Sequence, residues 1–144
     1  MAEQDFHEKA LKEKCLKLLR QYTKHEIVKI TNSGDSAIFG ALSIAKQHGC
    51  TEIFIPDQGG WLSYQTFPKL LDIKITELKT NYGIIEPEEL EKEAKKHKEK
   101  NNKEKSKNAA LLFSSFAGYA APQPIEQIAK ICKENNILMI EDAS

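Results

Sequence analysis

The feature that most constrains the fold is an alternation of β-rich runs with helical periodicity along residues 26–144. Five short runs are rich in apolar and β-branched residues: 27–30, 52–55, 73–78, 109–113 and 137–140. Segments with apolar residues at helical spacing separate them: 37–45, 61–71, 86–100 and 124–135. Strands that alternate with helices form parallel sheets covered on both faces. We therefore expect an α/β fold with a doubly wound, mainly parallel sheet of about five strands and flanking helices.

Two charged segments flank or interrupt this pattern. Residues 1–25 have the three- and four-residue apolar spacing of an amphipathic helix, and we expect this helix to precede a domain at 26–144. Residues 91–107 are rich in lysine and poor in apolar residues. A basic patch for RNA is one interpretation, but no aromatic residue is interleaved for base stacking. We expect a solvated helix end and loop there.

Composition excludes several classes of protein. The 144 residues are 40% hydrophobic, enough for a core, and 21 basic residues balance 21 acidic ones, so no net field attracts nucleic acid or membrane. No apolar run is long enough to span a membrane, and the polar N-terminus is unlike a signal peptide, so we expect a cytoplasmic protein. The widely spaced Cys15, Cys50 and Cys132 argue against zinc or disulfides, and we expect reduced, mostly packed thiols.

The carboxyl ends of parallel strands meet at one edge of a sheet, where ligands bind. The loops 32–36, 57–61, 114–119 and 141–144 are expected at that edge. Residues 33–36, Ser-Gly-Asp-Ser, begin a helix and could bind phosphate through free backbone N–H groups. Alternatively, Ser33 or Asp35 caps the helix.

Two further residues of these loops could hold a planar ring. Trp61, the single tryptophan, follows the second expected strand and could stack on a cofactor or simply pack at the rim. Asp142 follows the last expected strand, where a carboxylate could hold a ring-nitrogen proton or a metal, or cap a helix. No histidine lies near these loop positions, which disfavours a metal.

Together these motifs resemble the large domain of aspartate-aminotransferase-fold enzymes that use pyridoxal 5'-phosphate (PLP), closest to the DegT/StrS sugar aminotransferases. The family motif S-G-T-x-A-L is similar to residues 33–38, SGDSAI, and its E-D-A-A to residues 141–144, EDAS. Residues 82–90, YGIIEPEEL, also look like the segment that follows the third strand in many relatives. The resemblance spans about residues 26–144 and implies an incomplete PLP-binding large domain.

The resemblance also implies roles for single residues. Asp142 would be catalytic because it would pair with the protonated pyridine nitrogen and keep the ring electron-accepting. The cofactor site would comprise Gly34, Asp35 and Ser36 at the phosphate, Trp61 on the ring, Asp142 and Ser144. Asp35 stands where the family has threonine, so we expect its carboxylate to turn away and Ser36 to supply the hydroxyl. The register of Trp61 is shifted, and Tyr64 is the alternative aromatic residue.

The family's Schiff-base lysine lies beyond the strand that ends at the aspartate, and no lysine of this sequence matches it. We therefore expect the cofactor-binding part of an aminotransferase-like enzyme that is inactive by itself. It would act on small-molecule amino donors and acceptors, as a homodimer in the complete protein or with a partner chain. The family topology implies that strand 27–30 lacks its sheet neighbours and that strand 109–113 is an exposed apolar edge. The alternatives are a non-catalytic binding or assembly module, and an unrelated phosphate- or nucleotide-binding α/β domain.

Overall fold

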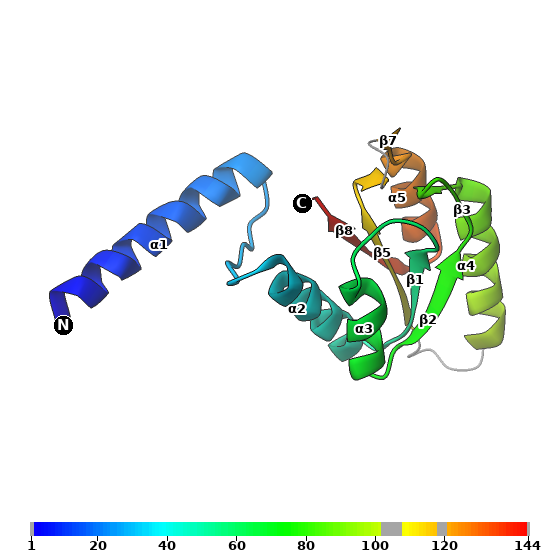
Figure 1. Cartoon of the computed structure of the whole chain (residues 1–144), viewed down its shortest axis with the longest axis horizontal. Helices are drawn as coiled ribbons and strands as arrows, with labels where there is room; N and C mark the ends of the chain where they lie inside the picture. Colours follow the sequence, from blue (N-terminus) through cyan, green and yellow to red (C-terminus); the bar gives the residue numbers. More distant parts are fainter. Residues whose placement is uncertain (1, 102–107, 118–120, 144) are drawn as a thin grey trace. The chain divides into compact units, whose positions relative to one another are not determined.

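The computed structural model describes residues 2–101, 108–117 and 121–143. The chain divides into two compact units, residues 1–33 and residues 34–144 (Figure 1). Among the described residues, no helix is both long and apolar enough to cross a membrane.

The first unit contains one long helix, α1 (Ala2–Thr23). Thr23 closes its last turn, because its hydroxyl donates to the Leu19 carbonyl oxygen at 2.8 Å. Residues 24–33 form no helix or strand, so the strand expected at 27–30 is wrong for this structure. Ile27 is 81% exposed. A β-branched run becomes a strand only when a neighbour pairs with its backbone and packs against its side chains, and the described sheet provides no such neighbour.

The second unit is built on a four-stranded parallel sheet with the order β2-β1-β5-β8. The strands are β1 (Cys50–Pro56), β2 (Lys74–Leu78), β5 (Asn108–Ser114) and β8 (Ile137–Asp142). These are the other four strands that the sequence predicts, in the expected parallel orientation. The expectation that residues 109–113 form an exposed edge is wrong, because β5 pairs with β1 on one side and β8 on the other. The outer strands of the described sheet are β2 and β8.

Helices cover both faces of this sheet, as the alternation predicts (Figure 1). Side chains of α2 (Gly34–Gln47) and α3 (Ser63–Leu70) pack with Ile53 and Ile55 of β1 on one face. Those of α4 (Pro87–Asn101) and α5 (Ile125–Glu134) pack with Phe54 on the other. Successive side chains of a strand point to opposite faces, so one buried strand supplies both cores. The sheet is doubly wound.

Two short antiparallel ribbons extend the sheet's connections. They pair β3 (Thr80–Asn81) with β4 (Ile84–Ile85), and β6 (Phe116–Ala117) with β7 (Ala121–Pro122). The buried side chain of Gln123 joins the two connections, since it accepts from the Ile85 N–H at 2.9 Å and donates to the Gly83 carbonyl at 2.9 Å. The ribbons are thereby fixed to each other by a buried amide.

The lysine-rich helix α4 pairs much of its charge within itself. Ion pairs at helical spacing join Lys92 to Glu89, Lys95 to Glu91 and Lys96 to Glu93. Exposed pairs of this kind contribute only a few tenths of a kcal/mol each. The apolar stripe of α4 is nevertheless buried, through Leu90 and Ala94. Residues 102–107 of the charged segment lie outside the described residues.

Candidate active site at the carboxyl edge of the sheet

A cavity of about 360 Å³ lies at the carboxyl ends of β5 and β8. Gly34, the first residue of α2, and Asp142, the last residue of β8, both line it. Apolar and small side chains make up most of the remaining wall: Ala37, Ile38, Ala41, Leu112, Ile140 and Ala143, with Glu141. The fold thus brings a helix N-terminus and a carboxylate, 108 positions apart in the sequence, to one hollow.

Gly34 leaves the backbone at the start of α2 accessible. A β-carbon built at Gly34 would meet no atom within 4 Å, and its φ angle is not positive, so neither packing nor backbone geometry requires a glycine there. The first N–H groups of a helix have no partner within the helix and lie at the positive end of its dipole. Asp35 in this first turn is exposed and Ser36 is half-buried.

Asp142 is held from two sides. Its backbone carbonyl accepts from the Ser115 N–H at 2.9 Å, and its side-chain Oδ2 accepts from the Tyr64 hydroxyl at 2.9 Å. Tyr64 belongs to α3 and is only 2% exposed. Burial, and then the neighbouring Asp142 carboxylate, raise the pKa of Tyr64 well above its usual value. Tyr64 therefore stays a neutral hydrogen-bond donor across the physiological pH range.

Gly60 fixes the ring of Tyr64. The φ angle of Gly60 is +78°, and a β-carbon at this position would lie 2.6 Å from Cδ2 and 2.7 Å from Cε2 of that ring. Only glycine combines this backbone conformation with so close an approach. The loop between β1 and α3 thus packs closely against the ring whose hydroxyl donates to Asp142.

The structure brings together some of the expected site residues. Gly34 and Asp142 line one cavity, and Asp35 and Ser36 follow in the first turn of α2. Trp61 is 63% exposed and is not among the residues that line this cavity, whereas Tyr64, the alternative aromatic residue, contacts Asp142 directly. Ser144 lies outside the described residues.

Asp57, in the same loop as Gly60, has a structural role. Its Oδ1 accepts from the Thr80 N–H at 3.0 Å and from the Thr80 hydroxyl at 2.6 Å, and its Oδ2 pairs with Lys79 at 3.2 Å. Burial acts to raise the pKa of Asp57, but these contacts outweigh it and lower the pKa. The Asp57 carboxylate links the carboxyl ends of β1 and β2. Both of its oxygens are occupied by these contacts, so we assign it a structural role.

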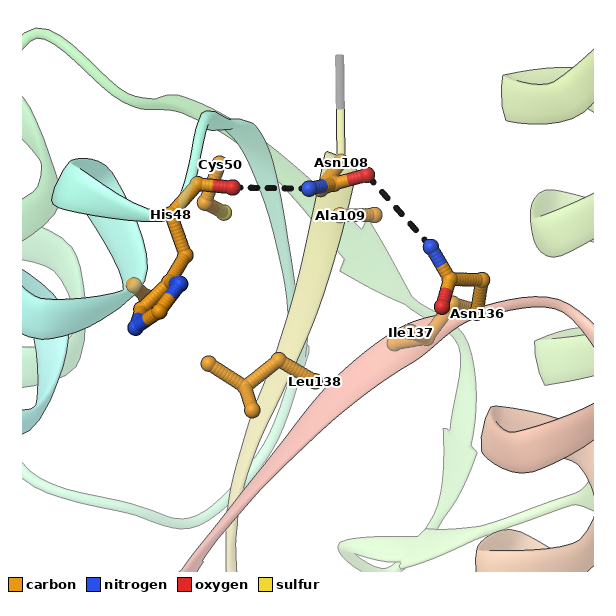
Figure 2. Close-up of a pocket in the computed structure, with 8 residues that line it drawn as sticks. His48, Cys50, Asn108, Ala109, Asn136, Ile137 and Leu138 are labelled. Atoms are coloured by element: carbon orange, nitrogen blue, oxygen red, sulfur yellow. Dashed lines mark hydrogen bonds between the residues drawn. The ribbon is translucent and has the colours of Figure 1, made fainter. Parts of the chain in front are cut away.

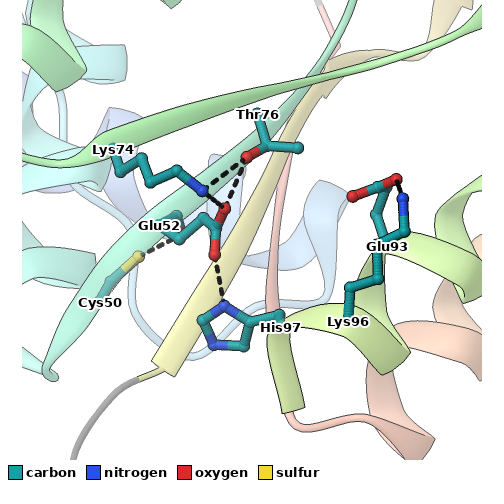
Figure 3. Close-up of polar contacts among 7 residues, drawn as sticks. All are labelled: Cys50, Glu52, Lys74, Thr76, Glu93, Lys96 and His97. Carbon is teal, nitrogen blue, oxygen red and sulfur yellow. Dashed lines mark hydrogen bonds and ion pairs between the residues drawn. The ribbon is translucent and has the colours of Figure 1, made fainter. Parts of the chain in front are cut away.

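A buried polar cluster, which was not among the site residues expected from the sequence, lies near the amino ends of β1 and β2 (Figure 3). Glu52 accepts from Lys74, from the Thr76 hydroxyl at 2.5 Å and from Nδ1 of His97 at 2.6 Å. Burial acts to raise the pKa of Glu52, but hydrogen bonds from Lys74, Thr76 and His97 outweigh it and lower the pKa to about 2. The spacing of Leu90, Ala94 and His97 was the signal that His97 faces the core.

A second cavity, of about 310 Å³, also lies at the amino ends of the strands (Figure 2). Its polar side chains make structural hydrogen bonds. The Asn108 amide donates to the His48 carbonyl at 2.7 Å and accepts from the Asn136 amide at 3.5 Å. Cys50 beside it is buried and donates to the Glu52 carbonyl at 3.1 Å. Burial raises the pKa of Cys50, which makes it a poor nucleophile.

All three cysteines are free thiols, and Cys50 and Cys132 are buried while Cys15 is exposed. Two of the three cysteines are thus packed, as expected, while Cys15 is not.

No protein-family model and no curated protein sequence matches the chain, but solved structures do. The serine palmitoyltransferase of Sphingomonas wittichii is similar with a TM-score of 0.67 and 16% identity, over 88% of this chain and 29% of that one. A structure described as SPT with PLP gives a TM-score of 0.66, also with 16% identity and coverage of 88% and 29%. DesV of S. venezuelae, in complex with a ketimine intermediate, gives 0.57 with 17% identity over 78% of this chain and 27% of that one.

The chain thus spans less than a third of the length of the structures it matches. What it shares with them is the layered arrangement of a parallel sheet between helices, and the partial large domain expected from the sequence has this arrangement. The described residues therefore have a fold similar to that of a portion of the solved structures they match, which are PLP-dependent aminotransferase-fold enzymes.

Proposed function

We propose that this chain provides the phosphate and ring-nitrogen subsites of a PLP site. The observation that carries the proposal is the shared cavity of about 360 Å³ lined by both Gly34 and Asp142. A helix N-terminus attracts a phosphate dianion, and a carboxylate attracts a protonated ring nitrogen. A cofactor with one group at each end needs both kinds of residue around one hollow.

The residues present fit the phosphate end. The open space at Gly34 lets a phosphate approach the N–H groups of the first turn of α2, and Ser36 in that turn adds a hydroxyl donor. Asp35 opposes an anion, but its side chain is exposed and belongs to the solvent side of the turn. Binding energy at this end would come from backbone donors and the helix dipole.

The residues also fit the ring end. Asp142 would hold a proton on the ring nitrogen, and Tyr64 would keep its carboxylate in place. When bound, PLP supplies a cationic ring that accepts electrons from a substrate carbon. The apolar wall around Leu112 and Ile140 would exclude water from the ring. The resemblance adds two residues to the proposed site, Trp61 as the residue that would stack on the ring and Ser144 as a further cofactor-binding residue.

We further propose that the complete protein is an aminotransferase of the DegT/StrS type that acts on small-molecule amino donors and acceptors. Support comes from the motifs at residues 33–38 and 141–144 together with the fold likeness to DesV. It would act in the cytoplasm, which the free thiols favour, as a homodimer or with a partner chain. The cofactor would bind this part of the protein without a covalent bond to any of its lysines.

The test uses 4-deoxypyridoxine 5'-phosphate, which lacks the aldehyde and so cannot react with surface lysines. Isothermal titration of the 144-residue chain should give one site per chain, with Asp142→Asn weakening binding about tenfold because an amide cannot pair with a cationic ring. Glu134→Gln, which changes an exposed carboxylate on α5 that does not line the cavity, is the matched control and should bind as the wild type does. A chain that binds a nucleotide or a flavin and ignores this analogue would support the unrelated-domain alternative.

Covalent attachment has its own test. After incubation with PLP itself, borohydride reduction and peptide mapping should show only scattered, substoichiometric labelling of surface lysines. A stoichiometric adduct on one lysine at the carboxyl edge of the sheet would contradict the proposed non-covalent site.

A further inference from the structure

The hydroxyl of the buried Tyr64 donates to Oδ2 of Asp142 at 2.9 Å. Tyr64 lies on α3 and Asp142 at the end of β8, 78 positions apart in the sequence. One strand, β5, separates β1 from β8 in the sheet. The contact therefore joins α3, the helix that follows β1, to the end of β8, an outer strand of the described sheet, at the cavity that Asp142 lines.

We infer that Tyr64 is a positioning residue, which fixes the Asp142 carboxylate in the orientation that receives a protonated ring nitrogen. This inference rests on the proposed function. It assigns Tyr64 a different task from ring stacking, since its hydroxyl is committed to Asp142 and its ring is packed against Gly60.

Three observations support the inference. The ring packs so closely on Gly60 that a β-carbon there would lie 2.6 Å from Cδ2. Tyr64 is 2% exposed, so its side chain is largely shielded from solvent. The hydroxyl stays protonated, because burial and Asp142 raise its pKa. A donor of this kind holds one carboxylate oxygen and limits rotation of the carboxylate about its Cβ–Cγ bond.

The variant that isolates this hydroxyl is Tyr64→Phe, which keeps the ring and its packing on Gly60. We expect its affinity for 4-deoxypyridoxine 5'-phosphate to fall about tenfold. Its affinity for the carbocyclic analogue, in which a C–H replaces the ring nitrogen, should be unchanged. Tyr22→Phe, which removes an exposed hydroxyl, is the matched control and should change neither affinity.

A spectroscopic signature separates positioning from a general structural effect. With an analogue labelled with ¹⁵N in the ring, the bound wild-type chain should show the chemical shift of a protonated nitrogen. Tyr64→Phe should shift this signal toward the unprotonated position, while Tyr22→Phe should not.

The outcomes distinguish the two claims. Failure of the wild-type chain to bind either analogue would overturn both the proposed function and this inference. If the wild type binds normally, two results for Tyr64→Phe would overturn the inference alone. One is an equal loss of affinity for both analogues, and the other is an unchanged ¹⁵N signal.

Discussion

Glu52 of β1 and His97 of α4 meet at 2.6 Å between Oε2 and Nδ1, at the opposite end of the sheet from the candidate site. A carboxylate oxygen only accepts, so Nδ1 of His97 carries the proton of this bond. The ring of His97 also lies edge-on to Phe54, with the ring centres 6.1 Å apart. The pair attaches the charged helix α4 to the core by one buried polar contact.

This pair predicts a pH dependence of folding. The pKa of Glu52 is lowered from 4.5 to about 2, so the stabilisation is complete above about pH 5 and is lost as the pH falls from about 5 to 2. Glu52→Gln should lower the free energy of unfolding at pH 7 by roughly 3 kcal/mol, and the difference from wild type should shrink toward pH 3. Urea denaturation at several pH values measures this.

The control for this prediction is Glu91→Gln, which removes an exposed carboxylate paired with Lys95 on the same helix. It should leave the pH profile close to that of the wild type, because exposed pairs contribute little. A difference between wild type and Glu52→Gln that is constant from pH 7 to pH 3 would contradict the assignment.

Gly60→Ala should destabilise the fold more than a neighbouring glycine replacement does. The methyl group would lie 2.6 Å from Cδ2 of Tyr64 and would force a positive φ of +78° on an alanine. We expect a loss of about 2 to 4 kcal/mol, part strain and part overpacking. Gly59→Ala, at φ +81°, measures the backbone cost in the same loop. Equal losses in the two variants would mean that the Tyr64 contact adds nothing.

Gly34→Ala should separate stability from ligand binding. The added methyl group meets no atom within 4 Å, so the fold should be as stable as the wild type or more stable by a few tenths of a kcal/mol. Affinity for 4-deoxypyridoxine 5'-phosphate should nevertheless fall several-fold, because the methyl group obstructs approach to the backbone.

The matched control for this prediction is Gly40→Ala, within α2, where a β-carbon also meets open space. It should stabilise the helix by about 0.5 to 1 kcal/mol and leave affinity unchanged. Equal affinity of the Gly34 variant and the wild type would argue against a phosphate at this turn.

The sequence predicts the elements of the fold better than their arrangement. Helical and strand periodicities identify four sheet strands and the helices between them, because those patterns reflect burial. The run at 27–30 has the same composition but no pairing partner in the described sheet, which local pattern cannot reveal. The central place of β5 depends on strand order, and strand order is a property of long-range packing.

The same distinction applies to the site. Gly34 and Asp142 are predictable, because each lies at the end or start of an element that must open on the carboxyl edge. The hydrogen bond from Tyr64 to Asp142 depends on how α3 lies over the sheet, and the Tyr64 ring packs there against the backbone of Gly60, a long-range relation that local pattern does not carry. His97 is concealed by its lysine and glutamate neighbours, although its spacing from Leu90 and Ala94 marks it as buried.

The position of β8 at the edge of the described sheet predicts association. β8 pairs only with β5, so its other side presents backbone N–H and C=O groups, and Leu138 on this strand is 44% exposed. An edge with unpaired backbone groups and apolar side chains is a template for another strand. The 144-residue chain should therefore self-associate as its concentration rises, which sedimentation velocity measures. Leu138→Lys should weaken that association, because a charge at a strand–strand contact is costly.

The matched control is Leu70→Lys, which changes an exposed leucine on α3 and should have no such effect. A monodisperse monomer with cooperative unfolding of ordinary stability would show instead that β8 tolerates an open edge in water, and the association predicted from its unpaired side would be wrong.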